Sequence, residues 1–391
     1  MKFLPYSRQK IDSKDIEAVK KVLKSDFLTQ GINVPKFEEN VAKKVGAKYA
    51  IAVNSATSAL HVACMSLEIK KNDIVWTSAN SFVASINCAT YLGAKVDFID
   101  IDKDTYNLSI DDLKQKLIVA KKINKLPKLI IVVHFAGLPC ELKKIYILSK
   151  TYNFKIIEDA SHAIGAKYYG DYIGNCKYAD VAIFSFHPVK IITSGEGGMC
   201  LTNNRNLRDK MLLLRSHGIT KDNSKFKKNK VDEPWYYEQQ ILGYNYRMSD
   251  IHAALGISQL KKLGMFIKKR NIIANNYYKL LKELPLILPE KNKNCISSFH
   301  LFVIRINFLN TKKTYKEVFN YLRKNKLWVN LHYLPIYSHP FYKNKYNKIK
   351  FKNMETYYKS AISIPIYPGL TFKNQMYVKK KLEFFFKNEK N

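Results

Sequence analysis

The chain has 391 residues, of which 47% are hydrophobic and 13% aromatic, and its formal net charge is +34. This length and composition exclude a small binding module and a disordered protein, and they allow two domains or one large domain with an appendage. A strong positive charge attracts polyanions. The lysines, however, are spread along the whole chain and form no single tail or stripe, so we expect no nucleic-acid partner.

The first residues, the apolar runs and the cysteines indicate the cell compartment in which the protein works. The opening segment, MKFLPYSRQK, meets charge early and lacks the apolar region of a signal peptide. The longest apolar runs, such as residues 129–138, are too short to span a bilayer, so we expect no membrane partner. The six cysteines lie far apart and form no CxxC pair, which is typical of reduced thiols. The sequence therefore predicts a cytoplasmic protein.

The first part of the chain alternates short β-branched runs with longer amphipathic stretches. Helices are expected from Ser55 and from about Ser81. Strands separated by helical patterns at intervals of roughly 25 residues indicate an α/β domain, in which a largely parallel sheet is covered by helices on both faces. The predicted strands are residues 49–54, 73–78, 94–101, 129–136, 154–159, 180–186 and 198–203.

The pattern changes at about Ser249 to long helices and a few strands. Together these predict a linking helix and a smaller α+β domain, and we divide the chain into domains at 1–248 and 249–391, with the N-terminal segment in the first. The densest basic run, KDNSKFKKNK at 221–230, is predicted to be a mobile surface loop. The expected elements of the second part are helices at 250–263, 266–284 and 315–325 and strands at 300–308 and 326–333.

Four polar groups follow the predicted strands, and ligands of an open parallel sheet bind outside the carboxyl ends of its strands. The segment VNSATSAL at 53–60 places small hydroxyl residues at a helix start, where they could receive a phosphate or act only as ordinary N-caps. Asp159 ends an apolar strand and could be a helix N-cap or a functional carboxylate. Ser185 and Lys190 complete the set.

Lys190 lies in SFHPVKIITSGEGG, residues 185–198, between a predicted strand and a glycine turn. A lysine of so basic a chain is ordinarily a solvated surface residue. Ile191 and Ile192 follow it directly, and apolar surroundings disfavour the ammonium form. A neutral amine is a nucleophile toward carbonyl groups.

The four groups together match the needs of pyridoxal phosphate (PLP). This cofactor requires a lysine that forms an imine, a carboxylate that keeps the pyridine nitrogen protonated and a cradle for the phosphate. Phe82, in ANSFVAS after the next strand, could stack on the ring or could equally be a core aromatic residue.

Several segments resemble the DegT/DnrJ/EryC1/StrS family of sugar aminotransferases, in the same order and over essentially the whole chain. Within the family, ASHA and FSFHPVK are most similar to the enzymes of pseudaminic acid synthesis. The resemblance implies the fold-type I architecture of PLP-dependent aminotransferases, with a mostly parallel sheet between helices in the large domain and a smaller C-terminal α+β domain. The similar segments are NSATSAL, SFVAS, EDASHAIGA, FSFHPVK with SGEGG, LRSHGI, GYNYRMSDIHAALGISQL and HYLPIY.

The resemblance also implies roles for individual residues. Lys190 matches the PLP-binding lysine and Asp159 the partner of the pyridine nitrogen. His162 takes the place of a glutamine that contacts the ring hydroxyl. Asn245 matches an asparagine that reaches the phosphate of the neighbouring subunit, which implies an obligate homodimer with shared active sites. The phosphate cradle would be Ala56, Thr57 and Ser185, and the stacking ring Phe82.

The sugar-nucleotide pocket is implied in the same way. Leu334 stands where the most similar relatives lead us to expect a lysine. No metal site is expected. The residues that match this pocket are Tyr6, Asp26, Phe27, Leu28, Thr29, Leu331, His332, Tyr333 and Leu334.

The implied reaction moves an amino group from L-glutamate to C4 of a UDP-linked 4-keto-6-deoxy-N-acetylhexosamine, with pyridoxamine phosphate as the intermediate form of the cofactor. Three alternatives stay open at this point. One is a sister aminotransferase that makes a legionaminic, bacillosamine or GDP-perosamine type precursor. A PLP-dependent sugar 3-dehydrase is disfavoured because such relatives carry histidine in place of Lys190. A non-enzymatic polyanion-binding protein is the third.

Overall fold

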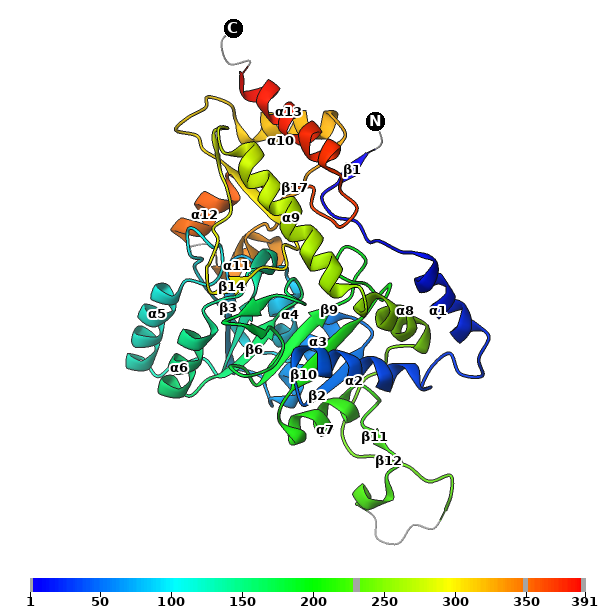
Figure 1. The fold of residues 1–391 in the computed structure, drawn as a ribbon. Coiled ribbons are helices and arrows are strands. Elements are labelled where there is room, and N and C mark those ends of the chain that lie inside the picture. The colour runs from blue at the N-terminus through cyan, green and yellow to red at the C-terminus, as the bar shows by residue number, and fades with distance from the viewer. Residues whose placement is uncertain (1–2, 228–232, 347–350, 388–391) are drawn as a thin grey trace.

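The computed structural model describes residues 3–227, 233–346 and 351–387 (Figure 1). At its centre is one seven-stranded sheet, which contains all seven strands predicted for the first part of the chain. In sheet order these are β2 (Tyr49–Val53), β10 (Gly198–Thr202), β9 (Val181–Ser185), β6 (Lys155–Asp159), β5 (Leu129–Val133), β3 (Ile74–Ser78) and β4 (Lys95–Ile99).

The sheet is parallel except at β10. Each neighbouring pair from β9 to β4 is parallel, whereas β10 is antiparallel to both β9 and β2. The connection from β9 to β10 spans residues 186–197 and contains no helix. A parallel return needs a longer crossover, so this short connection brings the chain back antiparallel.

Alternate residues of the strands face two different hydrophobic layers. Ile131 and Ile183 pack on the side of α3 and α4, and α7 joins this layer. Ile130 and Phe184 pack on the opposite side with α2, α5 and α6. The bounds of these helices are α2 (Asn33–Val45), α3 (Ala56–Ser66), α4 (Ala84–Thr90), α5 (Ile110–Lys122), α6 (Leu142–Tyr152) and α7 (Arg205–Leu214).

A third hydrophobic cluster lies in the C-terminal part, above the large sheet in Figure 1. There an antiparallel sheet in the order β13-β15-β17 packs against α9, α10 and α13. The elements of this part are α8 (Asp250–Leu260), α9 (Leu263–Leu281), β13 (Leu286–Ile287), β15 (Phe302–Ile306), α10 (Tyr315–Lys324), β16 (Leu327–Trp328), α11 (Pro340–Tyr346), α12 (Lys352–Tyr358), β17 (Ala361–Ile364) and α13 (Phe372–Lys387). The domain boundary at 248/249 stays a prediction.

The N-terminal segment contacts both parts of the molecule. Strand β1 (Leu4–Pro5) pairs with β16, and Leu4 belongs to the third hydrophobic cluster. Helix α1 (Ser13–Leu23), a few residues later, packs against α8. This segment therefore bridges the C-terminal elements and the helices beside the large sheet.

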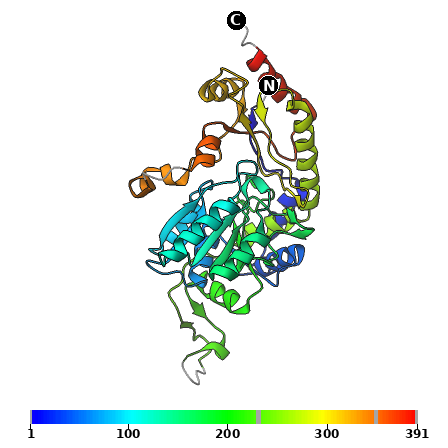
Figure 2. The same ribbon diagram turned by 90° about the vertical axis from the view of Figure 1, so that its left-hand side faces the viewer.

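A thin hairpin projects from the end of the molecule opposite the C-terminal elements (Figures 1 and 2). Its paired strands are β11 (Ile219–Thr220) and β12 (Glu238–Gln239). Within the predicted surface loop at 221–230, residues 223–225 form a short 3-10 turn, and residues 228–230 lie outside the described part of the chain. A further small sheet is formed by β14 (Cys295–Ile296), β7 (Lys167–Tyr168) and β8 (Asp171–Tyr172).

Two predicted elements differ from the structure. The helix expected from about Ser81 begins at Ala84, because residues 79–82 form the turn that leads from β3 toward the cavity described below. The strand expected at 326–333 is reduced to β16, since only its first residues pair with β1 and the rest turns away into the same cavity.

No helix in the described ranges is long and apolar enough to cross a bilayer. All six cysteines are free, and five of them are buried.

Candidate active site

A cavity of about 460 Å³ lies at the carboxyl ends of β6 and β9 and at the start of α3. Strand ends, helix starts and a segment of the C-terminal part meet there, as expected for an open α/β sheet. Of the residues proposed from the sequence, the cavity brings together Tyr6, Ala56, Thr57, Phe82, Asp159, His162, Ser185, Lys190, Leu331, His332 and Tyr333.

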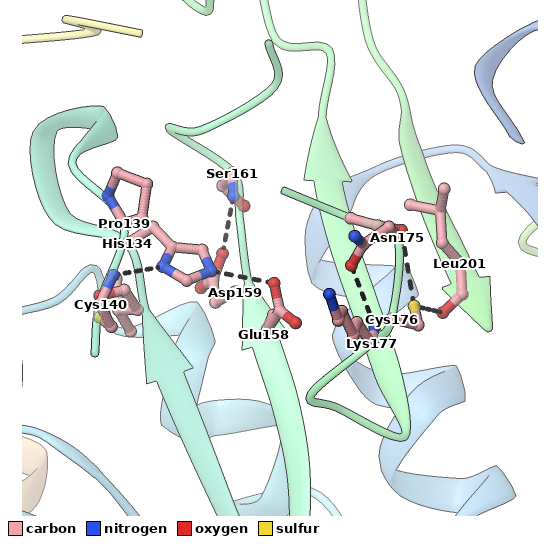
Figure 3. Close-up of polar contacts among 12 residues, drawn as sticks. His134, Pro139, Cys140, Glu158, Asp159, Ser161, Asn175, Cys176, Lys177 and Leu201 are labelled. Carbon is pink, nitrogen blue, oxygen red and sulfur yellow. Dashed lines mark hydrogen bonds and ion pairs between the residues drawn. The ribbon is translucent and has the colours of Figure 1, made fainter. Parts of the chain in front are cut away.

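Asp159 is buried at the end of β6, and both of its carboxylate oxygens accept hydrogen bonds. Ser85 Oγ donates to Oδ2 over 2.6 Å. The backbone N–H of Ser161 donates to Oδ1 over 3.1 Å (Figure 3). Ser81 Oγ lies 2.6 Å from Ser85 Oγ and extends this network. The carboxylate is therefore held in one orientation toward the cavity.

The preceding residue, Glu158, points to the other face of the sheet. Its Oε2 lies 3.1 Å from His134 Nε2, and both side chains are almost completely buried (Figure 3). His134 Nδ1 accepts a hydrogen bond from the N–H of Cys140, so Nε2 carries the proton and donates to Glu158. The His134–Glu158 pair joins the ends of β5 and β6 inside the protein, whereas the neighbouring Asp159 lines the cavity.

Lys190 follows β9 and is half-buried, with its exposed part in the cavity. Burial lowers the pKa of its ammonium group to about 8, although the negative charge of Asp159 acts in the opposite direction. Two contacts hold the surrounding loop. The backbone N–H of Lys190 donates to His187 O, and Ser7 Oγ of the N-terminal segment donates to Val189 O over 2.8 Å. The neutral amine is therefore more populated near neutral pH than at an exposed lysine, although the ammonium form still predominates at pH 7.

The start of α3 offers an anion cradle. Ser55 is the N-cap and accepts from Ser58 N, while Ala56 and Thr57 form the first turn and line the cavity. The first N–H groups of a helix have no intrahelical acceptor and attract phosphate. A Cβ on Gly198 would lie 2.3 Å from Ser55 O, so only glycine lets β10 approach this turn so closely.

His162 belongs to a group of buried imidazoles beside the cavity. Its Nε2 pairs with Tyr333 Oη at 3.1 Å, its ring centroid lies 4.3 Å from that of His300, and Nδ1 is buried without a partner. Burial lowers the pKa of His162, His300 and His332, the last to about 3, so all three imidazoles are neutral at pH 7. An unpartnered nitrogen at this wall indicates that a bound ligand supplies its hydrogen bond.

The model of the DegT/DnrJ/EryC1/StrS aminotransferase family matches residues 9–383. The chain belongs to this family. It is 42% identical over 380 residues to the UDP-4-amino-4,6-dideoxy-N-acetyl-beta-L-altrosamine transaminase of Campylobacter jejuni serotype O:2, with 97% of this chain and 96% of that protein covered. The resemblance stated from the sequence is confirmed.

Solved structures of aminotransferases also match this chain over nearly its whole length. PseC of Helicobacter pylori, an aminotransferase involved in the biosynthesis of pseudoaminic acid, superposes with a TM-score of 0.89 at 31% identity over 99% of this chain and 100% of that chain. The sugar aminotransferase Spr1654 of Streptococcus pneumoniae in its PMP-form matches with a TM-score of 0.86 at 25% identity, over 98% and 99%. The chain is thus a sugar aminotransferase with the fold-type I architecture expected from its sequence.

DegT family aminotransferases depend on PLP, and the residues of the cavity fit this cofactor. The cradle at α3 suits its phosphate, the fixed carboxylate of Asp159 suits a protonated pyridine nitrogen, and the unpartnered His162 Nδ1 suits the ring hydroxyl. Phe82 is 56% exposed, so its ring is accessible to a stacked ligand. Within the described ranges, no three His, Cys, Asp or Glu side chains are grouped to hold a metal ion.

Some residues proposed from the sequence lie elsewhere in the single chain. Asp26 and Phe27 line a separate groove formed with α1, α2 and α8. Leu28 and Thr29 are exposed and line neither cavity, and Leu334 is half-buried just beyond the cavity wall. Asn245 is exposed outside the cavity. The roles of these six residues stay predictions.

Sequence reasoning did not identify several residues of the cavity. Ser81 and Ser85 orient Asp159, and the available signal was their spacing of four residues across a helix start, with Ser81 before α4 and Ser85 in its first turn. His300 is a polar residue directly before the apolar run LFVI of a predicted strand. His187 and Glu196 flank Lys190 in sequence, and Nε2 of the former lies 3.9 Å from Oε1 of the latter.

Proposed function

We propose that this enzyme transfers the amino group of L-glutamate to C4 of a UDP-linked 4-keto-6-deoxy-N-acetylhexosamine, in nucleotide-sugar biosynthesis of the pseudaminic acid type. The observation that carries this proposal is the cavity in which Lys190 and Asp159 face the α3 cradle. The similarity to the Campylobacter transaminase over nearly the whole chain supports the choice of substrate.

PLP, when bound, supplies an electron sink that stabilises negative charge at the Cα of the amino acid. Residues of the chain hold and transfer the protons of the reaction. Asp159, fixed by Ser85 and Ser161, holds a proton on the pyridine nitrogen. The Lys190 amine, whose pKa is lowered by desolvation to about 8, removes and returns the proton at the substrate carbon when it is in its neutral form.

The buried walls of the cavity keep water away from this proton transfer. His162, His300 and His332 are neutral and add no competing charge next to Lys190. Tyr333 keeps its phenol proton, because burial raises its pKa, and it pairs with His162. Proton movement is therefore concentrated on Lys190.

The proposal includes a homodimer with shared active sites. Asn245 is exposed outside its own cavity, and it forms a β-bridge with Ser216, which shortly precedes β11 of the projecting hairpin, so it can meet a second copy. The hairpin exposes large apolar side chains, with Trp235 78% and Leu242 79% accessible, as is typical of a surface that is covered in an assembly. We propose that Asn245 binds the cofactor phosphate of the partner.

A cytoplasmic location is part of the same proposal. Cys64 and Cys88 lie with their sulfur atoms 3.6 Å apart and remain unbonded, as do the other cysteines. Free thiols at this separation suit a reducing compartment.

The decisive experiment offers the PLP-loaded enzyme L-glutamate and a panel of UDP- and GDP-linked 4-ketosugars, and identifies the products by mass spectrometry and NMR. We expect a 4-amino product from the UDP-linked 4-keto-6-deoxy-N-acetylhexosamine and none with Lys190→Ala. Preference for a GDP sugar would assign the enzyme to a sister activity, and the absence of any aminated sugar would end the proposal.

The shared site is tested by mixing two inactive variants. Lys190→Ala lacks the amine, and Asn245→Asp places a negative charge where the phosphate of the partner is proposed to bind. In a mixed dimer one of the two sites has both native residues, so activity should return to about a quarter of the native level after random exchange of subunits. If the mixture stays inactive although exchange is shown by mass spectrometry, Asn245 does not act across the dimer.

A further inference from the structure

Tyr333 and His162 meet where the two parts of the molecule come together. Tyr333 follows β16 in the C-terminal part, and His162 follows β6 of the large sheet. Tyr333 Oη lies 3.1 Å from His162 Nε2, which is within hydrogen-bonding distance. The other ring nitrogen, His162 Nδ1, is buried and has no partner among the described residues. The direction of the Tyr333–His162 hydrogen bond therefore decides whether Nδ1 is a donor or an acceptor.

His162 is neutral, because burial lowers its pKa and the neighbouring Lys190 and His332 lower it further. A neutral imidazole carries one ring proton, so one nitrogen donates and the other accepts. With the proton on Nε2, His162 would donate to Tyr333 and Nδ1 would be an acceptor. With the proton on Nδ1, Tyr333 donates to Nε2 and Nδ1 is a donor.

The acidities of the two groups favour the second arrangement. A phenol O–H is a stronger donor than an imidazole N–H, and the lone pair of an imidazole nitrogen is a stronger acceptor than a phenol oxygen. Tyr333 keeps its proton because burial raises its pKa, and the neighbouring Tyr6 and Asp159 act in the same direction. The hydroxyl of Tyr333 therefore donates to Nε2, and the proton of His162 lies on Nδ1.

The protein holds both rings of this pair in place. The backbone N–H of Tyr333 donates to Asn80 Oδ1 over 3.1 Å. Its ring contacts those of Phe82 and Phe135, with centroids 6.0 and 6.4 Å away. The ring of Phe135 also meets His162 edge-on, at a centroid distance of 6.2 Å. The contact of Oη with Nε2 is thus set by packing on both sides.

The ring oxygen of PLP requires a donor. It is held as an anion, because the protonated pyridine nitrogen withdraws electrons from the ring. Only the tautomer of His162 that is protonated on Nδ1 can donate to this oxygen. We propose that Tyr333 is a positioning residue for the cofactor, which fixes the tautomer of His162 so that Nδ1 presents a proton to the ring oxygen.

This inference deepens the proposed function and rests on it only through the binding of PLP at Lys190. It gives the segment after β16 a role at the cofactor, since that segment supplies the hydroxyl that orients the imidazole proton. A glutamine in place of His162 would need no such partner, because its amide carries a donor and an acceptor on separate atoms.

The first test is a double-mutant cycle on the PLP-loaded enzyme without substrates, read from the pH midpoint of its visible absorbance band. The band changes when the linkage between Lys190 and the cofactor loses its proton. A donor to the ring oxygen favours this loss, because it stabilises the charge that remains there. Tyr333→Phe should therefore raise the midpoint by about half a pH unit. Added to His162→Gln, it should leave the midpoint unchanged.

Tyr337→Phe is the matched control. It removes a second tyrosine hydroxyl from the same segment, which donates to Glu355 Oε1 over 2.7 Å and does not line the catalytic cavity. Thermal unfolding shows that each variant is folded, and the midpoint of the control should not move. An equal shift in the control, an equal shift with and without His162, or no shift with His162 present would each overturn the inference.

A second measurement reads the tautomer directly. Nitrogen-15 NMR of the PLP-loaded enzyme, labelled in its nine histidines and compared with His162→Gln, identifies the two ring signals of His162. Protonated and unprotonated ring nitrogens differ in chemical shift. We expect the proton on Nδ1 in the native enzyme and a mixture of tautomers in Tyr333→Phe. A proton on Nε2 in the native enzyme would contradict the inference whatever the variants show.

These results separate a failure of the inference from a failure of the proposed function. Neither readout uses L-glutamate or a sugar. If the substrate panel gives no aminated sugar, the proposed function fails while the tautomer of His162 can still be as inferred. If amino transfer occurs and the cycle shows no coupling between Tyr333 and His162, only the inference is wrong.

Discussion

Ser85 Oγ donates a 2.6 Å hydrogen bond to Oδ2 of Asp159. Because the Ser85 proton is used there, its oxygen accepts from Ser81 Oγ, and the pair forms a short directed relay. The residue that pairs with the cofactor nitrogen in our proposal is thus itself held by α4 and the turn before it. Its position depends on contacts with residues that were not part of the sequence-based site.

Replacement of Ser85 by alanine should reduce catalysis more than stability. The change removes one donor to a buried carboxylate, which corresponds to about 1 to 2 kcal/mol, or roughly a tenfold lower kcat/KM. We expect a smaller loss with Ser85→Thr, which keeps the hydroxyl. Steady-state kinetics check the prediction, and equal rates for the native and alanine enzymes would show that Asp159 is held without Ser85.

The reactivity of Lys190 should depend on pH with a midpoint near 8 in the cofactor-free protein. Below this pH the amine is protonated and inert, and above it the amine is a nucleophile, whereas an ordinary exposed lysine reaches this point near 10.4. Trace acetylation at a series of pH values, followed by mass spectrometry of the peptide that contains residue 190, gives the midpoint. A midpoint above 10 would contradict the desolvated environment.

The same lowered pKa has a consequence for stability, with a definite sign. Between about pH 8 and pH 10.5 the unfolded chain binds the Lys190 proton and the native chain does not, so this group makes the free energy of unfolding increase with pH. Below about pH 8 Lys190 is protonated in both the native and the unfolded chain, so the cost of burying its charge lowers the free energy of unfolding by the full amount. Lys190→Met should therefore raise the Tm of the cofactor-free protein at pH 7, and should raise it less at pH 10. A lower Tm at pH 7 would show that the ammonium is well solvated.

Gly198→Ala should disrupt the phosphate cradle. The added Cβ would lie 2.3 Å from Ser55 O and 2.5 Å from Ala56 N, so either β10 or the start of α3 must move. Overpacking of this kind costs about 1 to 3 kcal/mol. We expect the affinity for PLP to fall by at least tenfold, as measured by equilibrium dialysis. Gly264→Ala is the matched control, because nothing lies within 4 Å of its added Cβ.

Removal of the Glu158 carboxylate should destabilise the fold without a direct effect on the cavity. In Glu158→Ala the buried Nε2–H of His134 loses its acceptor, which costs about 2 to 3 kcal/mol in the free energy of unfolding. Glu158→Gln keeps an acceptor oxygen and should cost less. Urea unfolding measures both changes, and Glu283→Ala, whose side chain is 82% exposed, serves as a neutral comparison.

The arrangement of the large sheet could be predicted from the sequence because each strand has its own local signal. The runs at 129–136 and 180–186 are nearly continuous apolar segments, as expected for strands covered on both faces, and they became β5 and β9. The direction of β10 was not predicted. The direction of this strand depends on the absence of a helix between residues 186 and 197, and the glycines of that segment indicate a turn without indicating the direction of the strand that follows.

The central residues of the site could be predicted for a similar reason. Asp159, Ser185 and the start of α3 follow directly on strands, so the topology alone brings them to one edge of the sheet. Lys190 was marked by the two isoleucines after it. The four-residue spacing of Ser81 and Ser85 can bring these two serines together, but their contact with Asp159 arises from tertiary packing, as does the tilted ring contact of His300 with His162.

The segment 326–333 shows where local patterns are insufficient. Its alternating side chains predict a strand, yet the regular pairing is limited to Leu327–Trp328, and Asn330 forms an isolated bridge with Ser363. Beyond this point the N–H of Tyr333 donates to Asn80 Oδ1 over 3.1 Å, a contact with a residue more than 250 positions away. Such a long-range contact competes with regular pairing and directs the segment into the cavity.

The pairing of β1 with β16 has a practical meaning for anyone who prepares this enzyme. Within a few residues of that pairing, Tyr6 lines the catalytic cavity and Ser7 holds the loop of Lys190 through Val189 O. A deletion of the first eight residues, harmless in many proteins, would here remove Tyr6 from the wall of the catalytic cavity. It would also remove the hydrogen bond by which Ser7 holds the loop of Lys190. Affinity tags are for this reason better fused after α13, none of whose residues line the catalytic cavity and whose end lies on the far side of the C-terminal part from the large sheet (Figure 1).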